Sequence, residues 1–245
     1  MRTLKITLAY DGTRFVGWQR QADGESIQGR LEDALGKLEG GPVTAHGAGR
    51  TDAGAHALGQ VASASVTCTH DTRTLTKALN AHLPADVRIV SVEDADESFH
   101  ARFSACGKTY RYQSRNTAIA DPFDRAFVWH LPEPLSLDAM AGAAALLVGT
   151  HDFGAFRSAG SEVSTTVRTV RRSEWRNNAG LLTYEISGDG FLRHMVRAVV
   201  GTLVEVGRGW RQPDEIPALL TGAARAQAGA TAPPHGLFLV SVDYD

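Results

Sequence analysis

Apolar and polar residues follow two different periods along the chain, that of strands and that of helices. Residues 2–10 alternate, with Leu4, Ile6 and Leu8 on one face, which predicts a half-buried strand. After Ser26, a good helix N-cap, apolar residues recur three and four positions apart until a Gly-Gly-Pro run ends the pattern. The first hundred residues continue as strand, helix and strand, an order typical of a compact α+β unit.

The same two patterns predict the remaining elements. Strands are expected at residues 60–66, 87–92, 107–114, 167–175, 181–186 and 237–242, and helices after Asp71, after Ser136, at 191–206 and at 214–220. Asn177, Asn178 and Gly180, which separate two of these strands, are a hairpin signal. An antiparallel hairpin argues against a doubly wound parallel sheet, so the α+β class is favoured for the whole chain.

The composition is that of a globular protein, because 245 residues with 43% apolar content are enough for one large domain or two modest ones. Cys68 and Cys106 form neither a CxxC pair nor a metal-like cluster, which is typical of a reduced cytoplasmic protein. The first residues alternate and include an early charge, so no signal peptide is expected. No stretch is apolar enough to predict a membrane span.

The formal net charge of −2 argues against a nonspecific nucleic-acid coat, because such binding depends on neutralising phosphates. The distribution of charge is more informative than its sum. Arg102, Lys108, Arg111 and Arg115 fall in a stretch without any acidic residue, and a second group of arginines occupies residues 157–176. Both groups are candidates for the wall of an RNA groove.

A glycine-rich stretch at residues 46–60, HGAGRTDAGAHALGQ, carries the most suggestive chemistry. Glycines on both sides of Arg50 and Asp52 favour a shaped loop that another molecule can approach closely. The simplest interpretation is a turn in which Asp52 bonds to nearby backbone. A metal site shared with His56 lacks a third ligand at convincing spacing, and a P-loop lacks its Gly-Lys-Ser/Thr ending. Because no second carboxylate lies in the loop, Asp52 would act as a lone nucleophile, base or ligand.

Arg197 is surrounded by apolar residues in the helix expected at 191–206, so its charge is expected to be largely buried. Such a guanidinium requires a carboxylate partner, because stranding its charge costs on the order of several kcal/mol. Asp189 and Glu205 are near in sequence and would give a structural ion pair. Asp52 is the alternative partner, since an opposite charge within about 4–6 Å keeps a nucleophilic carboxylate ionised.

Tyr110, Phe191 and Leu237 each have a structural and a functional interpretation. An isolated tyrosine on a strand usually belongs to the core, but Tyr110 shares its strand face with Lys108, and bases stack on aromatic rings among positive charges. Phe191 and Leu237 fit the core, and they equally fit the wall of a pocket that excludes water. Three histidines are expected to be structural or peripheral: His56, His151 and His194.

Five motifs resemble those of one known family, in the same order along the chain. GRTDAGAHA closely resembles the signature G-R-T-D-x-G-V-H-A of the tRNA pseudouridine synthase A family, with Ala55 in place of valine. The other four are YDGTRFVGWQRQ at 10–21, KTYRY at 108–112, GFLRHMVRAVVGTL at 190–203 and APPHGLFL at 232–239. Together the motifs span nearly the whole chain.

The resemblance implies an α+β fold of two similar domains, each with a ferredoxin-like or RNA-recognition-motif-like core, with their antiparallel sheets joined and a cleft between them. The domains would be residues 1–103, with the GRTDAGAHA loop, and residues 104–245, with KTYRY and GFLRHMVRAVVGTL. It also implies a cytoplasmic homodimer that binds one tRNA across both subunits. No metal, nucleotide or organic cofactor is expected, and the sequence has no P-loop, dinucleotide or zinc spacing.

The resemblance further implies the reaction, which is isomerisation of uridine to pseudouridine at positions 38, 39 and 40 of the tRNA anticodon stem-loop. Asp52 resembles the family's nucleophile or base, Arg197 its ion-pair partner and Tyr110 the tyrosine that stacks on the target base. Arg50 resembles the arginine that takes the space of the flipped nucleotide or holds its backbone. Phe191 and Leu237 would then wall the uracil pocket.

Two other classes of function remain open. A non-catalytic RNA-binding module would use the basic strand face and would keep its biological output when Asp52 is changed to Asn. A metal-dependent hydrolase would use Asp52, His56 and distant carboxylates, and it would lose its activity in the presence of a chelator.

Overall fold

The computed structural model describes residues 1–158 and 163–244, and the chain in it divides into two compact units. Unit 1 comprises Met1–Cys106 together with Phe238–Asp245, and unit 2 comprises Gly107–Leu237. The sequence predicts one boundary, between residues 103 and 104. The structure differs in that Phe238–Asp245, nearly all of the last strand, belongs with the first part of the chain rather than with the second.

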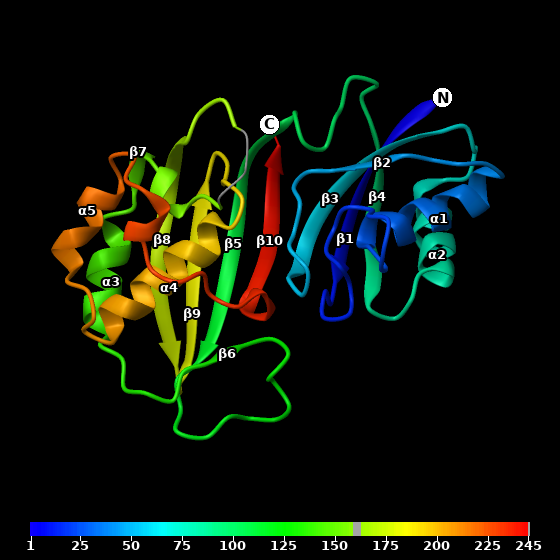
Figure 1. The fold of residues 1–245 in the computed structure, drawn as a ribbon. Helices are drawn as coiled ribbons and strands as arrows, with labels where there is room; N and C mark the ends of the chain where they lie inside the picture. The colour runs from blue at the N-terminus through cyan, green and yellow to red at the C-terminus, as the bar shows by residue number, and fades with distance from the viewer. Residues whose placement is uncertain (159–162, 245) are drawn as a thin grey trace. The chain divides into compact units, whose positions relative to one another are not determined.

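Unit 1 has the order of elements of a ferredoxin-like fold (Figure 1). Its elements are β1 (Arg2–Tyr10), α1 (Ile27–Glu39), β2 (Ala45–Gly47), β3 (His56–Val66), α2 (Thr72–His82), β4 (Val87–Ala95) and the C-terminal β10 (Leu237–Tyr244). β1 is antiparallel to both β3 and β4, and β2 is antiparallel to β3, which gives the order β4-β1-β3-β2. β10 runs parallel to the start of β3. The α+β class and the mostly antiparallel pairing expected from the sequence are confirmed.

The helix ends of unit 1 lie where the capping residues predict them. The Ser26 side chain accepts a hydrogen bond from the backbone N–H of Gly29, and Gly40 ends α1 in the left-handed conformation with φ of 72°. Asp71 caps α2 by accepting from Thr74. The alternating apolar face of β1 is fully buried, so the period of two in the sequence marks the core directly.

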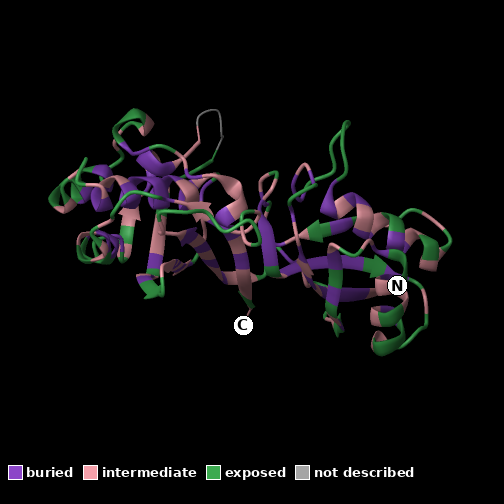
Figure 2. Ribbon diagram, turned by 90° about the horizontal axis from the view of Figure 1, so that it is seen from below, coloured by how far each residue is buried: buried purple, intermediate pink, exposed green. Residues whose placement is uncertain are grey.

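Unit 2 repeats the pattern of strands covered by helices. Its elements are β5 (Ala105–Arg115, whose first two residues lie in unit 1), β6 (Trp129–His130), α3 (Leu137–Ala145), β7 (Gly149–Asp152), β8 (Val167–Asn178), β9 (Leu181–Gly188), α4 (Met195–Gly207) and α5 (Ile216–Leu219), with short 3-10 turns at Gly154–Phe156, Pro213–Glu215, Arg225–Gln227 and Pro234–Gly236. β5, β9, β8 and β7 pair antiparallel in that order, and α3 packs against α4 and β8. Buried residues, purple in Figure 2, gather along the strands. Most residues of α4 are also buried.

The predicted hairpin is confirmed, since β8 and β9 are joined by Ala179 and Gly180, both at positive φ. The helix predicted at 191–206 begins later, at Met195, because His194 adopts a left-handed conformation with φ of 63° that no helix interior contains. The segment 214–220 is a 3-10 turn followed by the single turn of α5. Among residues 1–158 and 163–244, none of the helices combines the length and apolar character that crossing a membrane requires.

Candidate functional site

Asp52 lies in the loop between β2 and β3 of unit 1. The Ala55 N–H donates to the Asp52 carbonyl at 3.1 Å, and Gly54 between them has φ of 76°, so the loop does contain a tight turn. Thr51 and Ala55 are buried, while Asp52 is only partly buried. The turn and the catalytic interpretations therefore do not exclude each other, because the turn fixes the backbone of the loop and Asp52 is not fully buried.

The end of β1 and the segment that follows it contact the backbone and side chains of this loop. The Trp18 N–H donates to the Thr51 carbonyl at 3.1 Å, and the Tyr10 hydroxyl is 2.8 Å from the Thr51 hydroxyl oxygen. A methyl group at Gly12 would lie 1.9 Å from the Ala55 carbonyl oxygen, so only glycine allows the two segments to approach this closely. The YDGTRFVGWQRQ and GRTDAGAHA motifs thus form one structural unit.

A buried polar network completes this support. The Gln60 side chain is fully buried and donates to the Gly49 carbonyl at 2.8 Å, and it also reaches the Tyr10 hydroxyl at 3.4 Å. Burial raises the pKa of Tyr10 to about 12, against the smaller opposing effects of its hydrogen bonds to Thr51 and Gln60. Tyr10 is therefore a neutral hydroxyl that can both donate and accept, which is what a buried network requires. The sequence gives no local sign of this role for Tyr10, Thr51 or Gln60, because their hydrogen-bond partners lie up to 50 residues away along the chain.

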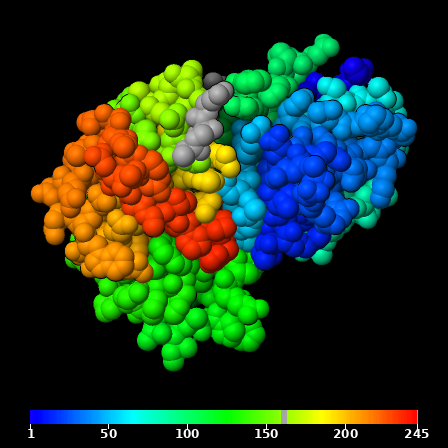
Figure 3. Space-filling view, in the orientation of Figure 1, coloured from blue at the N-terminus to red at the C-terminus, as the bar shows by residue number. Residues whose placement is uncertain are grey.

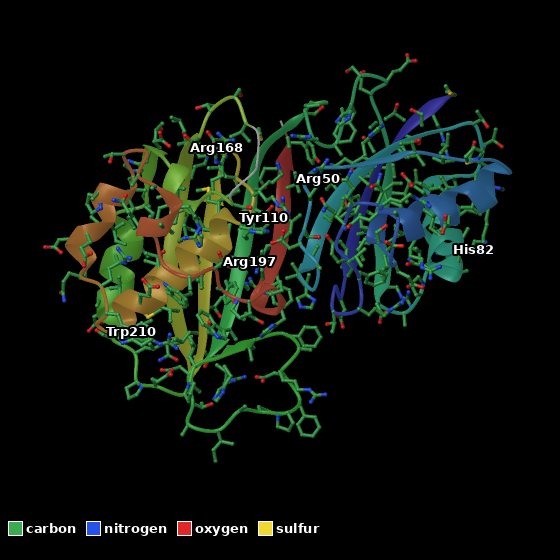
Figure 4. All side chains as sticks on the ribbon, in the orientation of Figure 1. Arg50, His82, Tyr110, Arg168, Arg197 and Trp210 are labelled. Carbon is green, nitrogen blue, oxygen red and sulfur yellow. The ribbon has the colours of Figure 1, made fainter. Side chains whose placement is uncertain are left out.

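Arg50 is exposed on the same loop (Figure 4), whereas His56 is buried at the start of β3. The His56 Nδ1 atom accepts from the Gly12 N–H at 3.0 Å and lies 3.2 Å from the Asp11 carboxylate. Its ring stacks on Phe238 with centroids 4.8 Å apart. These contacts give His56 a structural role. In the part of the chain that the structure describes, no group of three or more His, Cys, Asp or Glu side chains is placed to hold a metal ion.

In unit 2, the buried face of β5 carries Tyr110 and Tyr112, with 8% and 0% of their surfaces exposed. The Tyr110 and Phe191 rings form a T-shaped pair, with centroids 5.0 Å apart and an angle of 78° between the rings. Tyr110 and Phe191, identified separately from the sequence, are therefore brought together. Leu237 is also buried, with 7% exposed, and it lies at the start of β10.

Arg197 is the third residue of α4 and is half-buried (Figure 4). Its Nε–H donates to the Ala232 carbonyl at 2.8 Å. The two carboxylates nearest in sequence are directed elsewhere. Asp189 accepts from the Thr169 N–H at 3.0 Å, and Glu205 accepts from the Ala230 N–H and forms an ion pair with Arg211. A cation in the first turn of a helix faces the positive end of the helix dipole, so Arg197 stands where negative charge is stabilising.

The segment at residues 229–236 joins the unit 2 motifs. The Tyr112 hydroxyl donates to the Pro233 carbonyl at 2.8 Å, and a methyl group at Gly201 of α4 would lie 1.7 Å from the Ala230 carbonyl oxygen. Burial raises the pKa of Tyr112, although the charge of Arg197 acts to lower it. Burial lowers the pKa of His235, and the charge of Arg197 adds to that effect. KTYRY, GFLRHMVRAVVGTL and APPHGLFL thus converge around Arg197.

The candidate RNA-groove arginines are partly neutralised within unit 2. Arg111 donates to the Glu185 carboxylate at 2.7 Å, and Arg172 binds the other oxygen of the same group. Burial would raise the pKa of Glu185, but the hydrogen bond and charge of Arg111 and the charges of the neighbouring arginines outweigh it, and the pKa is lowered. Arg115 pairs with Asp124 at 2.5 Å. Some of the arginines that the sequence suggests for an RNA groove therefore form ion pairs within unit 2 instead.

Comparisons with known proteins identify the same family that the motifs resemble. The model of the "tRNA pseudouridine synthase" family matches residues 6–104 and 143–245. Over 246 residues the chain is 46% identical to "tRNA pseudouridine synthase A" of Moorella thermoacetica, with 100% of both chains covered. It is 44% identical to the protein of that name from Syntrophotalea carbinolica over 100% of this chain and 97% of the relative, and 44% identical to that from Bacillus pumilus over 99% of each.

Proposed function

The chain belongs to the tRNA pseudouridine synthase family, a family of isomerases that act on tRNA, and from this premise we propose that it isomerises uridines 38, 39 and 40 of the anticodon stem-loop. The full-length similarity to proteins named tRNA pseudouridine synthase A supports tRNA as the substrate, and the three positions are those that the resemblance of the motifs implies. In this reaction the N1–C1′ bond of the nucleotide breaks, the uracil turns, and a C5–C1′ bond forms. The hydrogen leaves C5 and N1 is protonated, so no co-reactant is consumed.

Asp52 is proposed as the nucleophile or base, attacking either the ribose or the uracil ring. The observation that carries this assignment is the loop in which it lies. Buried hydrogen bonds to Thr51 and a close approach that only Gly12 permits hold the backbone, and Asp52 itself is only partly buried. A catalytic group must be held to within a fraction of an ångström, and these contacts provide such support for the loop.

Arg197 is proposed as the partner that keeps the Asp52 carboxylate ionised. Two features of Arg197 support this pairing: its position in the first turn of α4, and the engagement of Asp189 and Glu205 by other groups. The helix dipole adds to the guanidinium charge, and both favour a negative group at this end of α4. Arg197 would raise the population of the reactive carboxylate without itself forming a bond to the nucleotide.

The target uridine is proposed to pack against Tyr110, with Phe191 and Leu237 walling the pocket. The edge contact between Tyr110 and Phe191 supports an aromatic lining that excludes water. Arg50, exposed on the Asp52 loop, would take the space that the flipped nucleotide vacates or hold its backbone. We further propose that the two compact units are the two domains expected of the family, with the last strand reassigned to the first.

The cytoplasmic location and the homodimer are also proposals. The sequence has two cysteines, Cys68 and Cys106, which form no CxxC pair, and this suits a reducing compartment. Ile119 and Phe123 of unit 2 are 84% and 92% exposed, and large exposed apolar side chains favour a protein interface.

The test is to incubate the protein with an unmodified tRNA transcript in EDTA and to map pseudouridine at each position. Wild type is expected to form it at 38, 39 and 40, and both Asp52→Ala and Asp52→Asn are expected to lose at least about 10³-fold in rate. Asp243→Asn, at an exposed aspartate of the same unit, is the matched control and is expected to match wild type.

Other outcomes would select the alternatives. If wild type and Asp52→Asn bind tRNA equally well and neither forms pseudouridine, a binding module is favoured. Dependence on added metal after chelation would favour a metal-dependent enzyme. Pseudouridine at other positions would support the proposed isomerisation and contradict the proposed positions.

A further inference from the structure

Three aromatic rings form a column on the surface of unit 1. His46 of β2 stacks on His100 with centroids 5.0 Å apart and 29° between the rings, and His100 meets Phe103 at 4.4 Å and 35°. The Phe103 side chain at the outer end is 77% exposed. The guanidinium carbon of Arg102 lies 5.7 Å from the centre of the Phe103 ring. We call these three rings the His46–His100–Phe103 column; its last two members lie in the turn between β4 and β5, which reaches the surface in Figure 3.

The turn that carries the column is anchored to the sheet of unit 1. Ala101 is fully buried, its N–H donates to the Ser63 hydroxyl at 3.1 Å, and its carbonyl accepts from the Tyr244 hydroxyl at 2.7 Å. The His100 Nδ1 atom accepts the Arg102 N–H at 3.1 Å. These bonds hold the rings in place before any partner arrives, so little conformational entropy is lost when one binds.

His100 contributes an uncharged ring to the column. Its Nδ1 atom is an acceptor, so the remaining proton is on Nε2. Burial lowers the pKa of His100, and the charges of His46 and Arg102 lower it further. The middle of the column is therefore a flat neutral surface at pH 7, and positive charge is supplied at its outer end by Arg102.

The fold does not account for the outer ring. Phe103 is 77% exposed, so it adds little to the core, and yet its ring continues the stack that His46 and His100 begin. The carboxylate of Asp96, at the start of the same turn, accepts from the N–H and the hydroxyl of Ser98. A ring next to a guanidinium is the combination that unpaired nucleotides bind, because the base stacks and the phosphate is neutralised.

We propose that the His46–His100–Phe103 column is a stacking site for one unpaired base of the tRNA, with Arg102 against the adjoining phosphate. This deepens the proposed function, on which it rests, by naming a second place where the substrate is held. The column is on the unit that carries Asp52, and His46 lies four residues before Arg50 in the same stretch of chain. Recognition here is expected to tolerate any base, since every base has a face that stacks.

The test measures the Kd for an unmodified tRNA transcript at fixed salt, with all variants in the Asp52→Asn background so that turnover plays no part. Phe103→Ala is expected to weaken binding about 5- to 100-fold, the loss typical of one stacked base. Phe103→Trp is expected to bind like the parent. Arg102→Gln is expected to weaken binding and to reduce the slope of log K against log salt by about one, whereas Phe103→Ala leaves that slope unchanged.

Trp210→Ala of unit 2 is the matched control, because Trp210 is 71% exposed and has the Arg208 guanidinium 4.6 Å from its ring, outside any such column. It is expected to bind tRNA like the parent, and thermal unfolding is expected to be unchanged in Phe103→Ala. Unweakened binding in Phe103→Ala, an equal loss in Trp210→Ala, or a change of oligomeric state in Phe103→Ala would each overturn the proposal.

Failure of this proposal and failure of the proposed function give different results. If wild type forms pseudouridine and Phe103→Ala binds tRNA normally, only the stacking site is wrong. If the Phe103→Ala effect on binding is present but wild type forms no pseudouridine, the proposed reaction is wrong and the stacking site stands.

Discussion

Unit 1 and unit 2 place helices on strands in a similar order, but they hold their candidate site residues differently. Asp52 of unit 1 lies on a loop whose backbone is held by a second segment through Trp18, Tyr10 and Gly12. Tyr110 and Arg197 of unit 2 lie on a strand and on a helix, which need no such support. Regular elements position a side chain by their own hydrogen bonds, whereas a loop requires tertiary contacts to reach the same precision. Loss of tertiary contacts should therefore displace Asp52 more easily than Tyr110 or Arg197.

Gly12→Ala is expected to have the largest effect on stability in unit 1. Its methyl group would lie 1.9 Å from the Ala55 carbonyl oxygen, so the two segments must separate, at a cost of about 2–3 kcal/mol in the free energy of unfolding. Urea unfolding measures this, and pseudouridine formation at a temperature where the variant stays folded should fall as well. Gly41→Ala is the control, because its methyl group meets nothing within 4 Å. Equal stabilities would show that the loop tolerates displacement.

Removing one buried hydroxyl from each unit sharpens the comparison. Tyr10→Phe leaves the Thr51 hydroxyl without this partner, and Tyr112→Phe does the same to the Pro233 carbonyl, so each is expected to lose about 1–2 kcal/mol of stability. Only Tyr10→Phe, next to the Asp52 loop, is expected to lower the rate at saturating tRNA. Chemical denaturation and single-turnover assays measure the two effects. A larger loss of rate in Tyr112→Phe than in Tyr10→Phe would contradict the claim that the Asp52 loop is the more easily displaced.

The smallest expected effect concerns acid stability in unit 1. Burial would raise the pKa of Glu39, but hydrogen bonds from the backbone N–H groups of Thr67 and Cys68 outweigh it and lower the pKa to about 2. Because the pKa of Glu39 is lower in the folded protein than the ordinary value of 4.5, the ionised carboxylate stabilises the fold above pH 4.5. That contribution is lost as the pH falls toward 2. The stability difference between wild type and Glu39→Gln should therefore shrink from pH 6 to pH 3. A difference that stays constant with pH would contradict this assignment.

Local sequence signals predicted the helix boundaries well where a side chain makes the cap. Ser26 and Asp71 bond to the first turn of their own helices, so three or four residues contain the whole signal. The start of the helix predicted at 191–206 is wrong because Leu192 continues the apolar pattern while His194 turns the chain out of helix. Periodicity describes which residues are buried, and it does not report the backbone conformation between them.

Non-local features were the ones that the sequence could not supply. β2 has three residues, too few for any period, and the pairing of β10 with β3 joins residues more than 170 positions apart. The glycines of the Asp52 loop predict a permissive backbone, but the partner that makes Gly12 necessary, Ala55, is found only from the three-dimensional structure. The resemblance of motifs supplied the candidate roles of Asp52, Tyr110 and Arg197, and those roles stay predictions.

A double-mutant cycle on the rate of pseudouridine formation tests the central claim most directly, namely that Asp52 of unit 1 and Arg197 of unit 2 act as one ion pair. Arg197→Met is expected to lower the single-turnover rate about 10²- to 10³-fold while tRNA affinity falls less than about threefold. Combined with Asp52→Asn, it is expected to add almost no further loss, because the pair is already broken. Losses that multiply in the double variant, or equal losses of rate and affinity in Arg197→Met, would contradict the account.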